Sequence, residues 1–414
     1  MSAIQTTLQM VLNGAISFRA CSAIVGLLQS FLPQFDAVPA PNTVQWWLLR
    51  LGLHELRRPK EKADDWIILI DHTIQLGGRK CLLVVGIRRS VWEQLDGPLT
   101  HEHLTVLLLE PVEKSDGKQV DRQLQAVVEI VGVPLAVLSD EGSDLVNGTG
   151  LFQQRHPGTL VFNDIAHKAA VVLKHELLDD PRWNAFVTHC GKTQPKVKQT
   201  ELGNLAPPTL KVKARYMNLG PLIAWGEKML RLIDTPAAQR PDKLDLSRLD
   251  EKFGWIRDFR EALVDWTDVH NVKDTVLEYA RIEGYHTQAA VELRQQLDLV
   301  AHTPAGQRVA DSLVEFVAQQ SQRVKPGESL PASSEVLESL IGKGKRLQGQ
   351  HSRGGFTKMI LGMAASVVTL SHDRVREALE MIKTIDLLEW CDEHLGSSMT
   401  AQRRQALPAT PEQK

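Results

Sequence analysis

The sequence predicts an α/β protein in which a mixed β-sheet is joined to helical segments before and after it. Short apolar runs typical of buried strands gather between residues 61 and 180. In the same range, stretches with helical period separate the later strands. Residues 1–60 give helical patterns, and residues 181–330 contain no convincing strand after Val187.

The bulk composition is that of an ordinary soluble globular protein. The 414 residues suffice for two or three domains, with 43% hydrophobic and 24% charged residues. No apolar run approaches the roughly 18 residues of a membrane span, and we expect no signal peptide or membrane association. The four cysteines lie far apart without a CxxC pair, which favours reduced thiols in the cytoplasm.

The net charge of −2 gives no support to nucleic-acid binding by the whole surface, so any such binding needs local basic patches. Residues 1–60 hold five basic and two acidic residues, a local excess of three positive charges. The basic residues include Arg50, Arg57 and Arg58, which we take as candidate DNA contacts.

Residues 1–60 are predicted to be a helix-turn-helix DNA-binding domain. An apolar-periodic stretch, Ile16 to Leu32, precedes a proline-rich loop, and Asn42 or Thr43 can cap a second helix with a basic end. A helix, a break and a second helix with a basic end form the pattern of a helix-turn-helix. The alternative is a small helical bundle with Trp46 and Trp47 in its core.

The range 61–180 alternates strands and helices. Three strands, a helix, a strand, a helix, a strand and a helix follow one another, which is the order of an RNase H-like core, although other α/β folds approximate it. The expected strands are 66–71, 80–87, 103–112, 134–140 and 159–164, and the expected helices are 120–132, 145–156 and 167–178.

The rest of the chain is predicted to be helical. An all-helical segment covers 181–330, with helical patterns at 217–234, 249–268, 273–299 and 305–323 separated by breaks such as TPAAQRPDK. A linker at 325–333 leads to closing helices near 334–347 and 356–393, within a segment spanning 331–395. The polar tail, 396–414, is predicted to be disordered.

Two aspartates stand where buried strands are predicted to end. Asp71 follows four apolar residues directly, and Asp140 ends the strand PLAVLSD. Carboxylates there cost desolvation unless a cation neutralises them. Mg²⁺ prefers such hard oxygen ligands, and a pair of ions can activate the attacking oxygen and stabilise the leaving one in phosphoryl transfer. The alternative is that both side chains only cap loops.

The third carboxylate has two candidates. Glu176 lies on the helix after the fifth strand, with 35 residues between it and Asp140, about where an uninterrupted integrase would have it. Glu338 lies in SSEVLESLIGKGK, where Ser333 or Ser334 can cap a helix that brings Glu338 and Lys345 onto one face. The alternative there is a solvated amphipathic helix.

These motifs together resemble the DDE transposases with a helical insertion, the group that holds the hAT, Mutator-like and several bacterial insertion-sequence families. The first strand is WIILID and the fourth ends in LSDEGSD. The fifth ends in NDIAH, which matches the group's C/DxxH motif with Asp164 and His167. SSEVLESLIGKGK is similar to the segment that opens the group's closing catalytic helix. The resemblance covers roughly residues 60–363, and we place the chain with bacterial insertion sequences.

The resemblance implies Asp71, Asp140 and Glu338 as catalytic, metal-binding carboxylates, with Glu176 the runner-up. It implies two Mg²⁺ ions, replaceable by Mn²⁺. Asp164 and His167 would support the metal site or contact DNA. A tryptophan of the insertion would stack on a flipped base, although tryptophan at helical spacing is more often core. The candidates for stacking are Trp225, Trp255 and Trp266, and those for contacts to DNA in the core are Lys80, Lys343 and Lys345.

The function that follows is that of a DNA transposase, which binds terminal inverted repeats, cuts the strands and joins them to target DNA. We expect a homo-oligomer on DNA, because two ends must be held together, and a location in the bacterial cytoplasm at the nucleoid. Two alternatives stay open: a catalytically silent, transposase-derived DNA-binding protein, and an RNase H-like nuclease that hydrolyses without joining.

Overall fold

The computed structural model describes residues 2–32, 35–76, 79–209, 219–236, 246–349, 357–396 and 406. It contains two compact units. The first consists of Met1–Asn163 and Ser334–Lys414, and the second is Asp164–Ser333. The predicted domain boundaries stay predictions.

The described strands form one mixed sheet of five in the first unit. Their order is β3-β2-β1-β4-β5, with β1 antiparallel to β2, β2 antiparallel to β3, and β1, β4 and β5 parallel. This order and these directions confirm the predicted RNase H-like α/β fold class. The strands are β1 (Trp66–Leu76), β2 (Arg79–Arg88), β3 (Thr105–Val112), β4 (Ala136–Ser139) and β5 (Leu160–Asn163).

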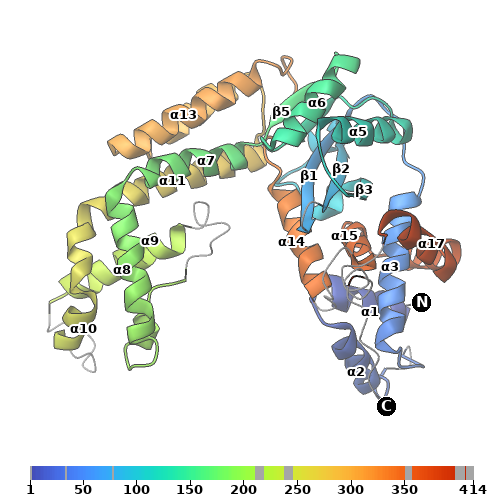
Figure 1. Ribbon diagram of the computed structural model, residues 1–414, viewed down its shortest axis with the longest axis horizontal. Coiled ribbons are helices and arrows are strands. Elements are labelled where there is room, and N and C mark those ends of the chain that lie inside the picture. Colours follow the sequence, from blue (N-terminus) through green and yellow to red (C-terminus); the bar gives the residue numbers. More distant parts are fainter. Residues whose placement is uncertain are drawn as a thin grey trace. The chain divides into compact units, whose positions relative to one another are not determined.

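One face of the sheet is covered by α5 (Gly117–Val131) and α6 (Ser143–Arg155), which Figure 1 shows beside the strands. Asp116 begins α5, because its side chain accepts a hydrogen bond from the Gln119 amide at 2.9 Å. The core between sheet and helices contains Ile68, Ile70, Leu82, Val84 and Val137 from the strands, and Val120, Leu124, Val127, Leu145 and Phe152 from the helices.

The opposite face is also buried, since alternate residues such as Ile67 and Leu69 are at most 1% exposed. Helix α14 (Glu335–Gly349) packs against β1, and α3 (Pro41–Arg57) and α15 (Leu361–Ala365) pack against β3. Helices α3 and α15 touch so closely that a Cβ added at Gly52 would lie 2.1 Å from the Leu361 carbonyl oxygen. The N-terminal and C-terminal helices therefore belong to the same unit as the sheet.

The N-terminal segment contains α1 (Ser2–Leu12), α2 (Phe18–Leu28) and α3. Asn42 and Thr43 do not cap α3: the helix begins at Pro41, whose fixed φ suits a first helical position, and Ala40 is the N-cap. Residues 29–40 separate α2 from α3, far more than the three or four residues of a helix-turn-helix, whose presence stays a prediction. Trp46 and Trp47 are only partly buried.

The predicted helix at 356–393 is wrong as a single element. The structure has η6 (Lys358–Ile360), α15, α16 (His372–Met381) and α17 (Thr384–His394) instead. A new N-cap interrupts the helical period, because the Ser371 side chain accepts a hydrogen bond from the Arg374 amide at 3.2 Å. The predicted disordered tail lies outside the described residues, apart from 396 and 406.

The second unit is built from helices. The described ones are α7 (Ile165–Leu178), α8 (Pro181–Val197), α9 (Gly220–Asp234), α10 (Leu246–Phe253), α11 (Arg260–Ile282), α12 (Ala289–Leu297) and α13 (Pro304–Ser321). Helix α11 runs through the break predicted between 268 and 273, and the chain turns at Gly284 instead, where φ is +69°. Residues 217–218 and most of the predicted break TPAAQRPDK lie outside the described residues.

Short elements complete the first unit, among them α4 (Arg89–Trp92) and η1 (His101–His103). A helix with the length and apolar character needed to cross a membrane is absent from the described residues.

Candidate active site

Asp71 and Asp140 directly follow the last residue pair of two adjacent parallel strands. Strands β1 and β4 are paired from Ile67 with Ala136 to Ile70 with Ser139. Because successive side chains of a strand alternate between faces, Asp71 lies opposite the core that contains Ile70, and Asp140 is near enough for its charge to act on Asp71. The sheet thus brings the two predicted carboxylates together at the end of the pairing of β1 with β4, and α14 packs against β1.

The predicted position of Asp71 needs a correction, because β1 does not end there. The strand continues to Leu76, paired with β2, and its register shifts between His72 and Gln75. Only the pairing with β4 ends at residue 70. The antiparallel neighbour extends β1 beyond the apolar run, which is why the sequence pattern missed it.

Asp140 stands in the loop after β4, as predicted. Its Oδ1 accepts a hydrogen bond from the Gly142 amide at 2.9 Å. A Cβ at position 142 would lie 2.9 Å from the same oxygen, so a larger residue there would press on the Asp140 carboxylate. This contact fixes the side chain at the beginning of α6.

Asp71 carries a carboxyl group with a strongly raised pKa. Burial, and next the charge of Asp140, raise the pKa of Asp71 to about 7. The His72 amide, which donates to Asp71 Oδ1 at 2.6 Å, and the charge of Lys345 act in the opposite direction, while Glu338 raises the pKa further. Three carboxylates and one lysine of the first unit therefore interact electrostatically at this point.

Glu338 comes from the first turn of α14. The Ser334 carbonyl accepts hydrogen bonds from the Leu337 amide at 2.8 Å and the Glu338 amide at 3.2 Å, so Ser334 is at the N-cap, as one of the two predicted serines. Leu337 and Leu340 are buried, and the Glu338 side chain is exposed. This side chain lies outside the core, on the helix that packs against β1.

A complete metal-ligand cluster is absent from the described residues, in which no three His, Cys, Asp or Glu side chains lie close enough to hold one ion. The Asp71–Asp140 pair still has the chemistry of a partial site, because Mg²⁺ is commonly held by one or two carboxylates together with water and substrate phosphates.

An unpredicted polar network lies beside the two aspartates. Lys80 Nζ forms an ion pair with Asp144 Oδ2 at 2.7 Å, and His72 Nε2 lies 3.0 Å from Ser115 Oγ and 3.7 Å from Asp144 Oδ2. It ties β1 and β2 to the first turn of α6. Its only signal in the sequence was the segment DEGSD, in which Asp144 follows Asp140.

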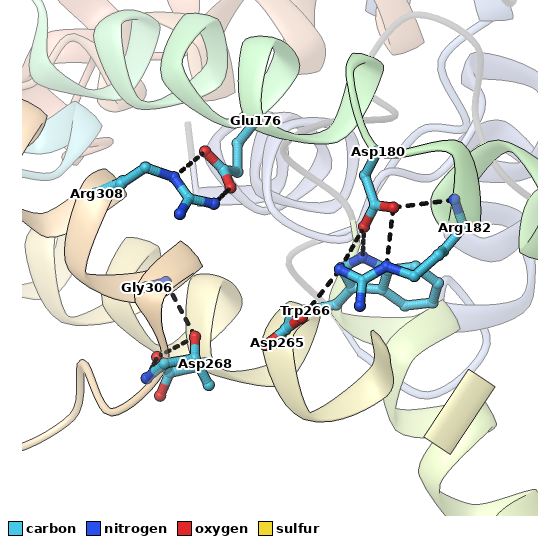
Figure 2. Close-up of polar contacts among 9 residues, drawn as sticks. Glu176, Asp180, Arg182, Asp265, Trp266, Asp268, Gly306 and Arg308 are labelled. Carbon is cyan, nitrogen blue, oxygen red and sulfur yellow. Dashed lines mark hydrogen bonds and ion pairs between the residues drawn. The ribbon is translucent and has the colours of Figure 1, made fainter. Parts of the chain in front are cut away.

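Glu176, the runner-up, lies on α7 in the second unit and forms an ion pair with Arg308 of α13 (Figure 2). Asp164 begins α7: it is 1% exposed, and its Oδ1 accepts a hydrogen bond from the Ala166 amide at 2.8 Å. His167 is partly buried on the same helix. These contacts give Glu176 and Asp164 roles within the second unit, and the functions predicted for them and for His167 stay predictions.

The tryptophans of the second unit are packed side chains. Trp266 is 2% exposed and donates to Asp180 Oδ2 at 3.0 Å, as Figure 2 shows. Trp225 is 8% exposed and donates to the Leu205 carbonyl at 2.8 Å. Trp255 is partly buried and stacks on His189 at 4.8 Å. The core interpretation holds for Trp225 and Trp266.

The predicted DNA-contacting arginines of α3 differ in their partners. Arg50 donates to two backbone carbonyls at the end of α16, and burial lowers its pKa. Arg58 forms an ion pair with the buried Glu55 at 2.6 Å. Arg57 is exposed. Arg50 and Arg58 therefore have structural partners within the unit.

The three lysines predicted to contact DNA have different surroundings. Lys80 is paired with Asp144. Lys345 is exposed and its charge acts on Asp71, and Lys343 is half-buried two residues earlier on α14. His101 and Arg346, which lie near Lys343, were not singled out from the sequence.

The comparisons with known proteins are sparse. No protein-family model matches the sequence, and no curated protein matches it. Among solved structures, the chain is similar to the Drosophila P element transposase strand transfer complex, with a TM-score of 0.40 and 11% identity over 90% of this chain and 92% of that one. This similarity gives no support to the narrower placement among bacterial insertion sequences. The fold class rests on the strand order, and the site rests on its own geometry.

Proposed function

We propose that the protein is a DDE-type DNA transposase, a polynucleotidyl transferase that cuts DNA strands and joins them to target DNA. The observation that carries this proposal is the pair Asp71 and Asp140. Each directly follows the last paired residue of one of two neighbouring parallel strands, β1 and β4, of an RNase H-like sheet. Helix α14 bears the third proposed carboxylate, Glu338, and packs against β1, the strand of Asp71.

A divalent cation fits the electrostatics of this pair. The charges of Asp140 and Glu338 both oppose ionisation of Asp71, and a cation would relieve that repulsion. Asp71, Asp140 and Glu338 would hold Mg²⁺, or Mn²⁺ in its place, and two such ions supply activation of the attacking oxygen and stabilisation of the leaving one. The residues of the chain hold the ions and orient the DNA strand.

DNA is the proposed partner, with Lys345 close enough to the carboxylates to influence Asp71 and exposed enough to meet a phosphate. Binding of terminal inverted repeats, self-association on DNA and location at the nucleoid of a bacterium belong to the same proposal.

The test is a cleavage and strand-transfer assay on labelled DNA taken from the sequence that flanks the reading frame. With Mg²⁺, the wild-type protein should nick the strand and yield joined product. Nicking without joining would indicate a nuclease instead. Failure to nick while DNA is bound would indicate a catalytically silent DNA-binding protein.

A matched set of variants tests the third carboxylate. Glu338→Gln should reduce nicking by more than the roughly 10–100-fold that is usual when a supporting group of a metal site is lost. Glu335→Gln, in the same helical turn, and Glu176→Gln should leave it nearly unchanged. Loss of nicking in Glu176→Gln, with full nicking in Glu338→Gln, would show that Glu338 is the wrong residue.

A further inference from the structure

A second polar feature of the first unit is a cavity of about 380 Å³ beside α14. Its walls are the end of α1 with the turn that follows, His101 of η1, and Lys343, Arg346 and Leu347 of α14. Ala15 of the turn has φ of +52°, a conformation that residues other than glycine seldom adopt. The turn that forms this wall therefore holds Ala15 in an unfavourable backbone conformation.

The cavity is basic. His101, Lys343 and Arg346 line it, and none of its lining residues is acidic. Neither Lys343 nor Arg346 forms an ion pair within the described part of the chain. The nearest acidic influence is Glu102, which is exposed and is not one of the lining residues. The cavity thus gathers positive charge that, among the described residues, is opposed by Glu102 outside the lining and not by an ion pair.

The positive charges of the cavity disfavour protonation of Lys343 and His101. Burial, and next the charge of Arg346, lower the pKa of Lys343. Burial and then the charges of Lys343 and Arg346 lower the pKa of His101, against a hydrogen bond with the backbone of Val336. An anion bound among them would remove this repulsion. A phosphate suits the donors, since lysine acts as a point charge and arginine as a planar fork.

The basic residues of the cavity lie further along α14 than Glu338. Lys343 and Arg346 are five and eight residues further on, which is roughly 7–12 Å along the helix axis. Such a span corresponds to about two to four nucleotides of one strand in duplex DNA. On the ideal helical wheel the two residues also point away from the face that Glu338 shares with Lys345.

We propose that His101, Lys343 and Arg346 form a binding site for a backbone phosphate of the DNA substrate, a few nucleotides from the phosphate at which the strand is cut. This rests on the proposed function for the identity of the ligand. The site itself is defined by the cavity and its three donors.

A purely structural role is the alternative, because cations stabilise the C-terminal end of a helix and α1 ends at this cavity. The end of α1 already has other partners: the Gln9 carbonyl accepts from the Asn13 amide at 2.8 Å, and the Met10 carbonyl accepts from the Ile16 amide at 3.1 Å. A structural role predicts a loss of thermal stability, whereas a phosphate site predicts a change in the salt dependence of DNA binding.

The experiment measures binding of a fluorescent DNA duplex by anisotropy across a series of salt concentrations, without divalent cation. Arg346→Gln and Lys343→Gln should each lower the slope of log affinity against log salt by up to about 0.9, the value for one phosphate contact. Lys118→Gln is the matched control, because Lys118 is an exposed lysine of α5, on the other face of the sheet. Arg346→Lys should restore most of the slope, and thermal unfolding checks that each variant is folded.

Several outcomes would overturn the proposal. They are an unchanged slope in folded Arg346→Gln and Lys343→Gln, a slope lowered as much by Lys118→Gln, and absence of DNA binding by the wild-type protein. Inorganic phosphate that raises the melting temperature of the wild type but not of Arg346→Gln, with an unchanged DNA slope, would assign the cavity to a free phosphate compound instead. Cleavage by the wild type with an unchanged slope would reject this site and leave the proposed function intact. A lowered slope without cleavage would support this phosphate site and reject the proposed catalytic function.

Discussion

Asp71 and Asp140 stand next to each other because Ile70 and Ser139 are the last paired residues of β1 and β4. The pairing of these strands brings the two carboxylates close together, and the charge of Asp140 opposes ionisation of Asp71. A fold optimised only for stability would avoid this arrangement, since like charges in a partly buried position destabilise the native state. Such conflicts are typical of functional sites.

The first prediction concerns this conflict. Asp71→Asn should stabilise the protein in the absence of metal, because the amide removes a like charge beside Asp140. Each unit of pKa shift corresponds to about 1.4 kcal/mol, and allowing for burial of the polar amide we expect a gain of about 1–2 kcal/mol. Thermal unfolding in a chelator should show it as a rise of roughly 2–4 °C per kcal/mol.

The same variant should lose its response to Mg²⁺, whereas the wild type should melt at a higher temperature when Mg²⁺ is added. Asp96→Asn, at an exposed position, serves as the control and should change neither value. A destabilised Asp71→Asn protein that still responds to Mg²⁺ would contradict the metal assignment.

The second prediction tests the close contact of α5 and α6. A Cβ added at Gly148 would lie 2.4 Å from the Val120 Cβ, so Gly148→Ala should cost about 1–3 kcal/mol through overpacking. Gly150→Ala lies on the same helix with no atom within 4 Å of the added Cβ, and should be neutral or stabilising by up to about 1 kcal/mol. Chemical denaturation of both variants decides this, and equal effects would argue against the packing.

The third prediction tests the core role of Trp266. Trp266→Phe keeps most of the ring but removes the hydrogen bond to Asp180, so the second unit should lose about 1–3 kcal/mol. Nicking of DNA should remain at the wild-type level at a temperature where the variant is folded. A strong loss of nicking without a loss of stability would support the stacking role instead.

The fourth prediction concerns the thiols. Cys21, Cys81 and Cys190 are buried, and burial raises the pKa of Cys21 to about 11 and that of Cys190 to about 12. At pH 8 the thiolate of Cys21 is therefore roughly a thousandth of the total. A maleimide should label the native protein at most at Cys391, which is partly exposed, and should label all four cysteines after unfolding. Rapid labelling of Cys21 in the native state would contradict its burial.

Much of the sheet could be predicted because a buried strand needs a run of apolar residues, which is visible in the local sequence. Apolar runs such as WIILID and KCLLVVGI are typical of buried strands, and their order indicated the RNase H-like core. The end of β1 could not be predicted, because its last residues are held by pairing with β2 and not by apolar character. The helix breaks after α15 and before α17 were missed because capping competes with a continuous helical period.

By itself, the sequence determined where the strands lie, apart from the end of β1, and that Asp71 and Asp140 follow the apolar runs of two of them. Tertiary structure alone decided that these strands are neighbours, that α14 packs against β1, and that Glu176 pairs with Arg308. It also decided that His101 joins Lys343 and Arg346 around one cavity. The physical reason is that periodicity shows which side of an element is buried, whereas the partner on that side comes from a distant part of the chain.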